Sequence, residues 1–174
     1  MGMDVSGINP KVNASINDFP TLKKIREMRT TDEGWKESMK LLDSDKSLSD
    51  KYWAEDKEYK DINCGVYFRN NCWWWRPLWN YCYAIADDII SEDVWDSGHC
   101  NDGAGLNEED AKQLGERLLK SIENGECLKY QAAYMQHQED MASDDEFATS
   151  YPFDIDNVKQ FAKFCIQSGG FEIW

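Results

Sequence analysis

The residues best suited to chemistry are the tryptophans and arginines gathered between positions 69 and 79. They are Arg69, Trp73, Trp74, Trp75, Arg76 and Trp79. Neighbouring side chains diverge by roughly 100° in a helix and 180° in a strand, so three consecutive tryptophans cannot all face one core. An exposed indole stacks on a flat ring, and a guanidinium forks a phosphate or carboxylate. We therefore expect a binding surface for a flat, nucleotide-like anion or for a partner protein. The alternative is that these rings fill the core.

An acidic stretch with a histidine forms the second candidate group. Residues 83–110 carry nine acidic side chains and no Lys or Arg, and they include Asp96, His99, Cys100 and Asp102. Oxygen-rich loops hold Ca²⁺ or Mg²⁺, while imidazole and thiolate hold Zn²⁺. The spacing fits neither an EF-hand nor an H-E-x-x-H motif, so we expect no metal and no cofactor. We place His99 and Asp102 on the same binding surface, beside the glycine-rich segment 98–105.

Catalytic motifs are missing from the sequence. His99 and His137 are the only histidines, and the chain has no G-x-S-x-G, P-loop or G-x-G-x-x-G sequence. A non-catalytic binding protein is therefore our first interpretation. Two alternatives remain open: an acidic mimic of nucleic acid that inhibits a basic protein, and a small enzyme that uses His99 with nearby carboxylates.

Composition excludes several classes of protein. The 174 residues carry a formal net charge of −14. Residues 1–72 contain 12 basic and 13 acidic side chains, whereas residues 73–174 contain 7 basic and 20 acidic side chains. Such a field repels nucleic-acid backbone and anionic membranes, so we expect neither as a direct partner. A hydrophobic content of 41% with 8 tryptophans is too high for a disordered acidic chain.

Cysteine spacing and apolar segments bear on the cellular setting. The six cysteines form no C-x-x-C pair, which excludes zinc ribbons and thioredoxin-like chemistry. No secretory signal and no run of about 20 apolar residues is visible. We expect a cytoplasmic protein, and the oligomeric state stays open.

Hydrophobic periodicity and capping residues predict the elements that position these groups. Helices are expected over residues 21–28, 31–42, 49–59, 78–89, 107–124, 128–135 and 156–168, with Trp73–Trp75 just before the fourth because Pro77 suits a first helical turn. The predicted fold is mainly α, an irregular multi-helix bundle with a small two-stranded β element joining 65–69 to 171–174. We expect a single domain over 1–174, with 13–62 as a helical insertion or lobe.

Several segments resemble a known group of proteins. They are Tyr67-Phe68-Arg69-Asn70-Asn71 running into Trp73-Trp74-Trp75-Arg76-Pro77-Leu78-Trp79, the loop 101–106, and the C-terminal run Ser168-Gly169-Gly170-Phe171-Glu172-Ile173. Together they are similar to small uncharacterised proteins encoded by bacteria and phages. The resemblance covers residues 64–174 and implies a cytoplasmic, prokaryotic or viral setting, with no activity attached. In a phage, we expect a binding protein of this kind either to sequester a host signal or to inhibit a host defence protein.

Overall fold

The computed structural model describes residues 2–141 and 150–174 and divides the chain into two compact units. One unit comprises residues 1–11 and 64–174, and the other comprises residues 12–63. Within the described residues the elements are mainly helical, which confirms the predicted class. No described helix is both long and apolar enough to span a membrane.

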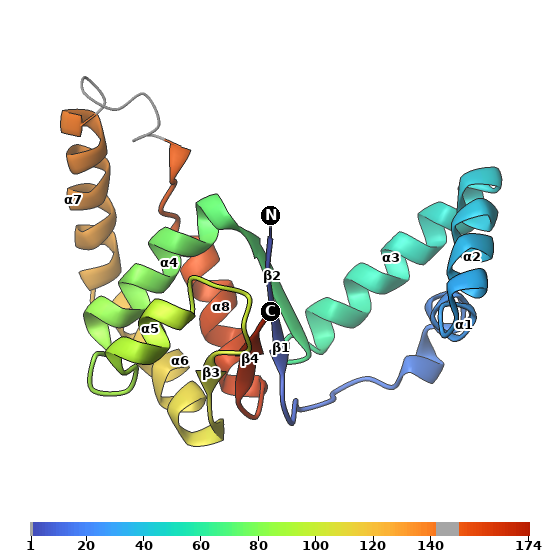
Figure 1. The fold of residues 1–174 in the computed structure, drawn as a ribbon, viewed down its shortest axis with the longest axis horizontal. Coiled ribbons are helices and arrows are strands. Elements are labelled where there is room, and N and C mark those ends of the chain that lie inside the picture. The colour runs from blue at the N-terminus through green and yellow to red at the C-terminus, as the bar shows by residue number, and fades with distance from the viewer. Residues whose placement is uncertain (1, 142–149) are drawn as a thin grey trace. The chain divides into compact units, whose positions relative to one another are not determined.

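A four-stranded antiparallel sheet lies along one side of the first unit, with the helices of this unit next to it (Figure 1). Its order is β2 (Tyr67–Asn71), β1 (Gly2–Gly7), β4 (Phe171–Ile173) and β3 (Gly105–Leu106). The predicted pairing of 65–69 with 171–174 is wrong, because β1 lies between those two strands. Asp4 pairs with Arg69 on one side, and Val5 pairs with Ile173 on the other. Met3 and Val5 alternate inward in β1, a period-2 signal confined to two apolar residues.

The described residues of this unit also form the helices α4 (Cys72–Ile85), α5 (Glu92–Ser97), α6 (Glu108–Glu123), α7 (Glu126–Met141) and α8 (Ile155–Gln167). Helices α4 and α8 both contact β1, and α6 packs along α8. Phe161 of α8 has ring contacts with Trp75 and Trp79 of α4 and with Phe171 of β4, so helices and sheet share one core. Side chains cap α6 and α8: Asn107 accepts a hydrogen bond from the backbone N–H of Asp110, and Asp154 accepts one from that of Asn157.

Helix α4 begins six residues earlier than the sequence predicts. The Asn71 side chain accepts a hydrogen bond from the backbone N–H of Trp74 at 3.0 Å, and this cap fixes Cys72 as the first helical residue. Pro77 consequently lies inside the helix rather than in its first turn. The three consecutive tryptophans belong to the first turn and the start of the second, so they point in different directions around the axis.

The second unit is an all-helical group formed by a short 3₁₀ turn (Ile16–Asp18), α1 (Pro20–Met28), α2 (Asp32–Ser44) and α3 (Lys46–Ile62). The three helices predicted in this region are confirmed, with α3 longer than expected. Their core contains Phe19, Leu22, Ile25, Leu42, Tyr52 and Tyr59. Arg29 ties the helices together: Nε donates to the Ser38 hydroxyl and Nη1 to the Tyr52 hydroxyl, each at 3.0 Å.

Candidate functional site

Two of the predicted surface tryptophans are core residues. Trp75 and Trp79 have no exposed area, and their rings stack with centroids 5.4 Å apart. Each indole N–H donates to a backbone carbonyl, Trp75 to Gly98 at 2.8 Å and Trp79 to Trp95 at 2.9 Å. The prediction that placed them on a binding surface is wrong, because both rings are used to fasten α5 and the following loop to α4.

Arg69 and Trp74 line one cleft at the start of α4. The cleft has a volume of about 570 Å³ and is lined by Gly2, Arg69, Asn70, Asn71 and Trp74. This volume lies within the range of small-molecule sites. Arg69 is exposed, and the Trp74 side chain is 36% exposed. A cation and an accessible indole therefore border the same space.

The guanidinium of Arg69 is oriented by β1. Its Nε lies 3.4 Å from Asp4 Oδ1, and that carboxylate also accepts a hydrogen bond from the Tyr67 hydroxyl. Burial and the Asp4 carboxylate raise the pKa of Tyr67 to about 12, so the tyrosine stays a donor. A Cβ atom at Gly2 would lie 3.1 Å from Arg69 Nε, which places the guanidinium directly over the glycine. Among the residues that the structure describes, the two terminal nitrogens of Arg69 have no partner.

Two asparagines give the cleft further polar groups. The Asn70 amide nitrogen donates to Asn157 Oδ1 at 3.0 Å, which leaves the Asn70 oxygen as an acceptor. The Asn71 oxygen is used by the helix cap, which leaves the Asn71 amide nitrogen as a donor. The cleft can thus offer a cation, an amide donor, an amide acceptor and an aromatic ring to one ligand.

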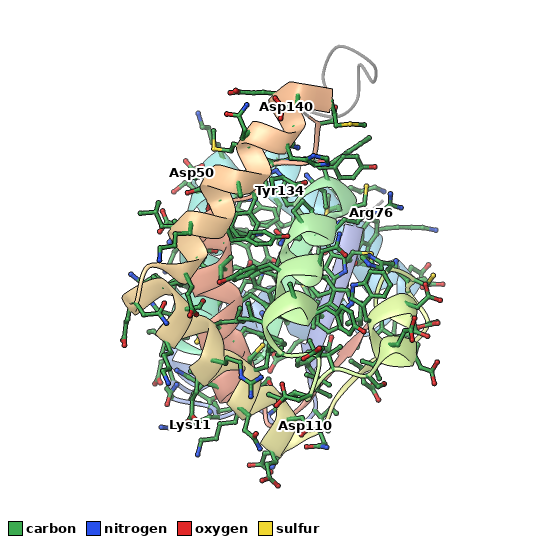
Figure 2. The ribbon with its side chains drawn as sticks, turned by 90° about the vertical axis from the view of Figure 1, so that its left-hand side faces the viewer. Lys11, Asp50, Arg76, Asp110, Tyr134 and Asp140 are labelled. Carbon is green, nitrogen blue, oxygen red and sulfur yellow. The ribbon has the colours of Figure 1, made fainter. Side chains whose placement is uncertain are left out.

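Arg76 and Trp73 do not join this cleft. Residues 74 and 76 are two positions apart, so their side chains leave α4 on opposite sides. Arg76 Nη1 donates to the Tyr151 hydroxyl at 3.1 Å, and the Trp73 and Tyr151 rings have centroids 4.7 Å apart. Figure 2 shows Arg76 on α4 and Tyr134 on α7; the Tyr134 hydroxyl donates to the backbone oxygen of Tyr151. Arg76 is thereby held to the segment that precedes α8.

His99 follows α5 and is half-buried against Trp95, with ring centroids 5.2 Å apart. Its Nδ1 is buried and has no hydrogen-bond partner within residues 2–141 and 150–174. Burial lowers the pKa of His99, the positive charge of Arg76 lowers it further, and Asp96 acts in the opposite direction. The imidazole is therefore held neutral, and its contacts are those of a packed aromatic residue. It does not line the cleft.

Asp102 is also outside the cleft, where its carboxylate accepts from the backbone of Ala104 within the same turn. Its neighbour Asn101 is the loop residue that reaches the cleft wall, since the Asn101 amide donates to the Gly2 carbonyl at 3.2 Å. Trp75, by holding Gly98, fixes the start of this loop. The loop therefore contributes to the site indirectly, because Asn101 holds Gly2, which lines the cleft.

The acidic stretch is a solvated surface. Eight of its nine acidic side chains are exposed and Asp110 is half-buried. Asp88 forms an ion pair with Arg117, which lowers the pKa of that carboxyl group. Figure 2 shows Asp110 near the lower end of this unit, well separated from Arg76 in its upper half. No group of three metal-binding side chains occurs in the described parts of the chain.

Four residues of the site are missed by sequence reasoning. Gly2 and Asp4 approach Arg69 only through the pairing of β1 with β2. Asn70 and Asn71 follow Arg69 directly, and an Asn three residues before Trp74 is an N-cap signal, which would have placed the helix start correctly.

Comparison with known proteins identifies no relative. No protein-family model, no curated protein and no solved structure matches the chain.

Proposed function

We propose that this chain is a non-catalytic binding protein whose cleft holds a flat anionic ligand between Arg69 and Trp74. The observation that carries the proposal is that an unshared guanidinium fork and an accessible indole border one 570 Å³ cleft. The fork suits a carboxylate or phosphate, and the indole face suits a planar ring. A ligand that combines both groups would use the whole cleft.

The polar groups around the cleft support binding over chemistry. Asn70 and Asn71 provide one acceptor and one donor that do not titrate, and the cleft lining contains no histidine, cysteine or serine. General acid–base or nucleophilic catalysis needs such a group within hydrogen-bond reach of the ligand. In the bacterial or phage setting that the resemblance implies, a protein that binds a small signalling molecule would lower its free concentration.

Isothermal titration calorimetry with matched variants tests the proposal. The panel is adenosine monophosphate, guanosine monophosphate, 2-naphthoate and 2-naphthyl phosphate. At least one should bind the wild-type protein. Arg69→Gln should weaken that binding by about tenfold or more, because a hydrogen bond to a charged group contributes about 1.5–3 kcal/mol. Trp74→Ala should have a similar effect through lost stacking.

The chain itself provides the controls, since Arg76 and Trp73 are exposed residues of the same types on the same helix. Arg76→Gln and Trp73→Ala should leave the affinity unchanged within about twofold. Absence of binding by every panel member would overturn the proposal. Equal losses in the control variants would also overturn it, because they would place the ligand on the surface formed by Trp73, Arg76 and Tyr151.

A further inference from the structure

The charge around the proposed cleft is nearly balanced, and this limits the ligand it can hold. Arg69 is the one basic residue among the described residues that line the cleft, and the Asp4 carboxylate lies 3.4 Å from its Nε. The first turn of α4 adds only a partial positive charge, equivalent to about half an elementary charge. The site is therefore weakly positive, unlike a phosphate site with several cations.

From this balance we infer that the ligand is a singly charged planar carboxylate, in preference to a phosphate monoester or a nucleotide. The inference rests on the function proposed above and narrows its ligand class. An anion bound to the free Nη fork of Arg69 would lie roughly 6 Å from the Asp4 carboxylate. With an effective dielectric of about 40, repulsion from Asp4 weakens the binding of each additional negative charge by about tenfold. This repulsion offsets most of the attraction of that charge to Arg69, so the larger desolvation cost of a doubly charged anion is not recovered.

The negative electrostatic field of the whole unit also disfavours ligands that carry more than one negative charge. Residues 1–11 and 64–174 carry 9 basic and 21 acidic side chains. A ligand with one charge loses less to this field than a ligand with two or more, and the difference is partly screened by salt. One carboxylate is enough to occupy both nitrogens of the fork, because its two oxygens match the guanidinium in a bidentate pair.

The other groups of the cleft fit the same ligand. Trp74 offers its ring, which requires a flat hydrophobic body. The Asn71 amide nitrogen, left over from the helix cap, can donate to a carboxylate oxygen or to a ring substituent. An aromatic monocarboxylate therefore satisfies the cation, the donor and the ring with one charge.

Three compounds with one ring system test the inference by calorimetry at about pH 8: 2-naphthoate, 2-naphthyl phosphate and 2-naphthamide. The naphthoate should bind about tenfold tighter than the doubly charged phosphate and tighter than the neutral amide. In Asp4→Asn, which keeps an oxygen for the Tyr67 hydroxyl, the difference between carboxylate and phosphate should fall by about tenfold.

The outcomes separate this inference from the proposed function. Phosphate binding as tight as naphthoate binding, or an unchanged preference in Asp4→Asn, overturns the inference and leaves a flat-anion site. Binding of neither these compounds nor the nucleotides overturns both. If Asp4→Asn does not fold, the binding of 2-naphthyl phosphate to the wild-type protein is measured at about pH 5 instead. At that pH most of this ligand carries one negative charge, because the second pKa of a phosphate monoester is about 6. Naphthyl phosphate should then bind about tenfold tighter than at pH 8, and an unchanged affinity would contradict the inference.

Discussion

Trp75→Phe should destabilise the protein far more than the same change at the neighbouring Trp74. Trp75 has no exposed area, and its indole N–H donates to the Gly98 carbonyl, which is itself buried. Phenylalanine cannot make this bond, and a buried carbonyl that loses its donor costs about 1–3 kcal/mol. Phenylalanine also lacks the second ring of the indole, and the loss of its packing contacts costs a further ~1–2 kcal/mol. We expect a total of about 3 kcal/mol.

The assay is thermal and urea unfolding followed by near-ultraviolet circular dichroism. For a chain of this size a loss of about 3 kcal/mol lowers Tm by roughly 6–12 °C. Trp74→Phe should change the free energy of unfolding by no more than about 0.5 kcal/mol, because that side chain is partly exposed. A Trp75→Phe protein as stable as the wild type would refute the assignment of Trp75 as the residue that fastens the 98–105 loop to α4.

Three further predictions concern stability. The folded-state pKa of His99 lies below its ordinary value of 6.5, so the unfolded chain binds the proton more tightly. Stability should fall as pH drops through about 6.5, and His99→Gln should reduce that slope in urea titrations, whereas an unchanged slope would contradict this role of His99. Asn107→Ala removes the cap of α6 and should lower the free energy of unfolding, measured by chemical denaturation, by about 1 kcal/mol. An unchanged denaturation midpoint would contradict this expectation. Arg29→Met removes the hydrogen bonds to Ser38 and Tyr52 and should destabilise residues 12–63 by about 1–3 kcal/mol, which faster amide exchange in these residues would report. Unchanged protection would contradict the role given to Arg29.

The helices are predictable from sequence where local signals agree. Asn107 and Asp154 are N-cap residues placed before apolar positions at helical spacing, and both helices begin after them. The sheet is less predictable, since β1 contains only two inward apolar residues and its partners are distant in sequence. Long-range pairing of so short a strand depends on packing against α4 and α8, which no local pattern encodes.

Helix α7 shows how side-chain chemistry can reverse an apolar pattern. Leu128, Ala132 and Met135 are spaced like a buried face, yet Leu128 is 60% exposed and Met135 is 51% exposed. The inward side carries Tyr130 and Tyr134, whose rings pack on Phe153. Tyrosines bury more area than Leu or Met and have a hydroxyl that can reach a backbone carbonyl, so they determine which face of the helix packs inward.

For the candidate site, residue types were predictable and their grouping was not. Arg69 and Trp74 meet because the Asn71 cap starts α4 immediately after β2. Arg76 was an equally good candidate by composition, but two further residues of helix turn it to the other side of α4. The outcome depended on the position of the helix start, which is the least reliable feature of a sequence pattern.

The most direct test of the central claim is the indole region of a ¹⁵N-correlated NMR spectrum recorded during titration with 2-naphthoate. The chain has 8 tryptophans, and single Trp→Phe variants assign their indole signals. The account predicts a saturable shift of the Trp74 signal with Trp73, Trp75 and Trp79 nearly unchanged, and no shift in Arg69→Gln at the same concentrations. A shift centred on Trp73, or no shift at any indole, would contradict it.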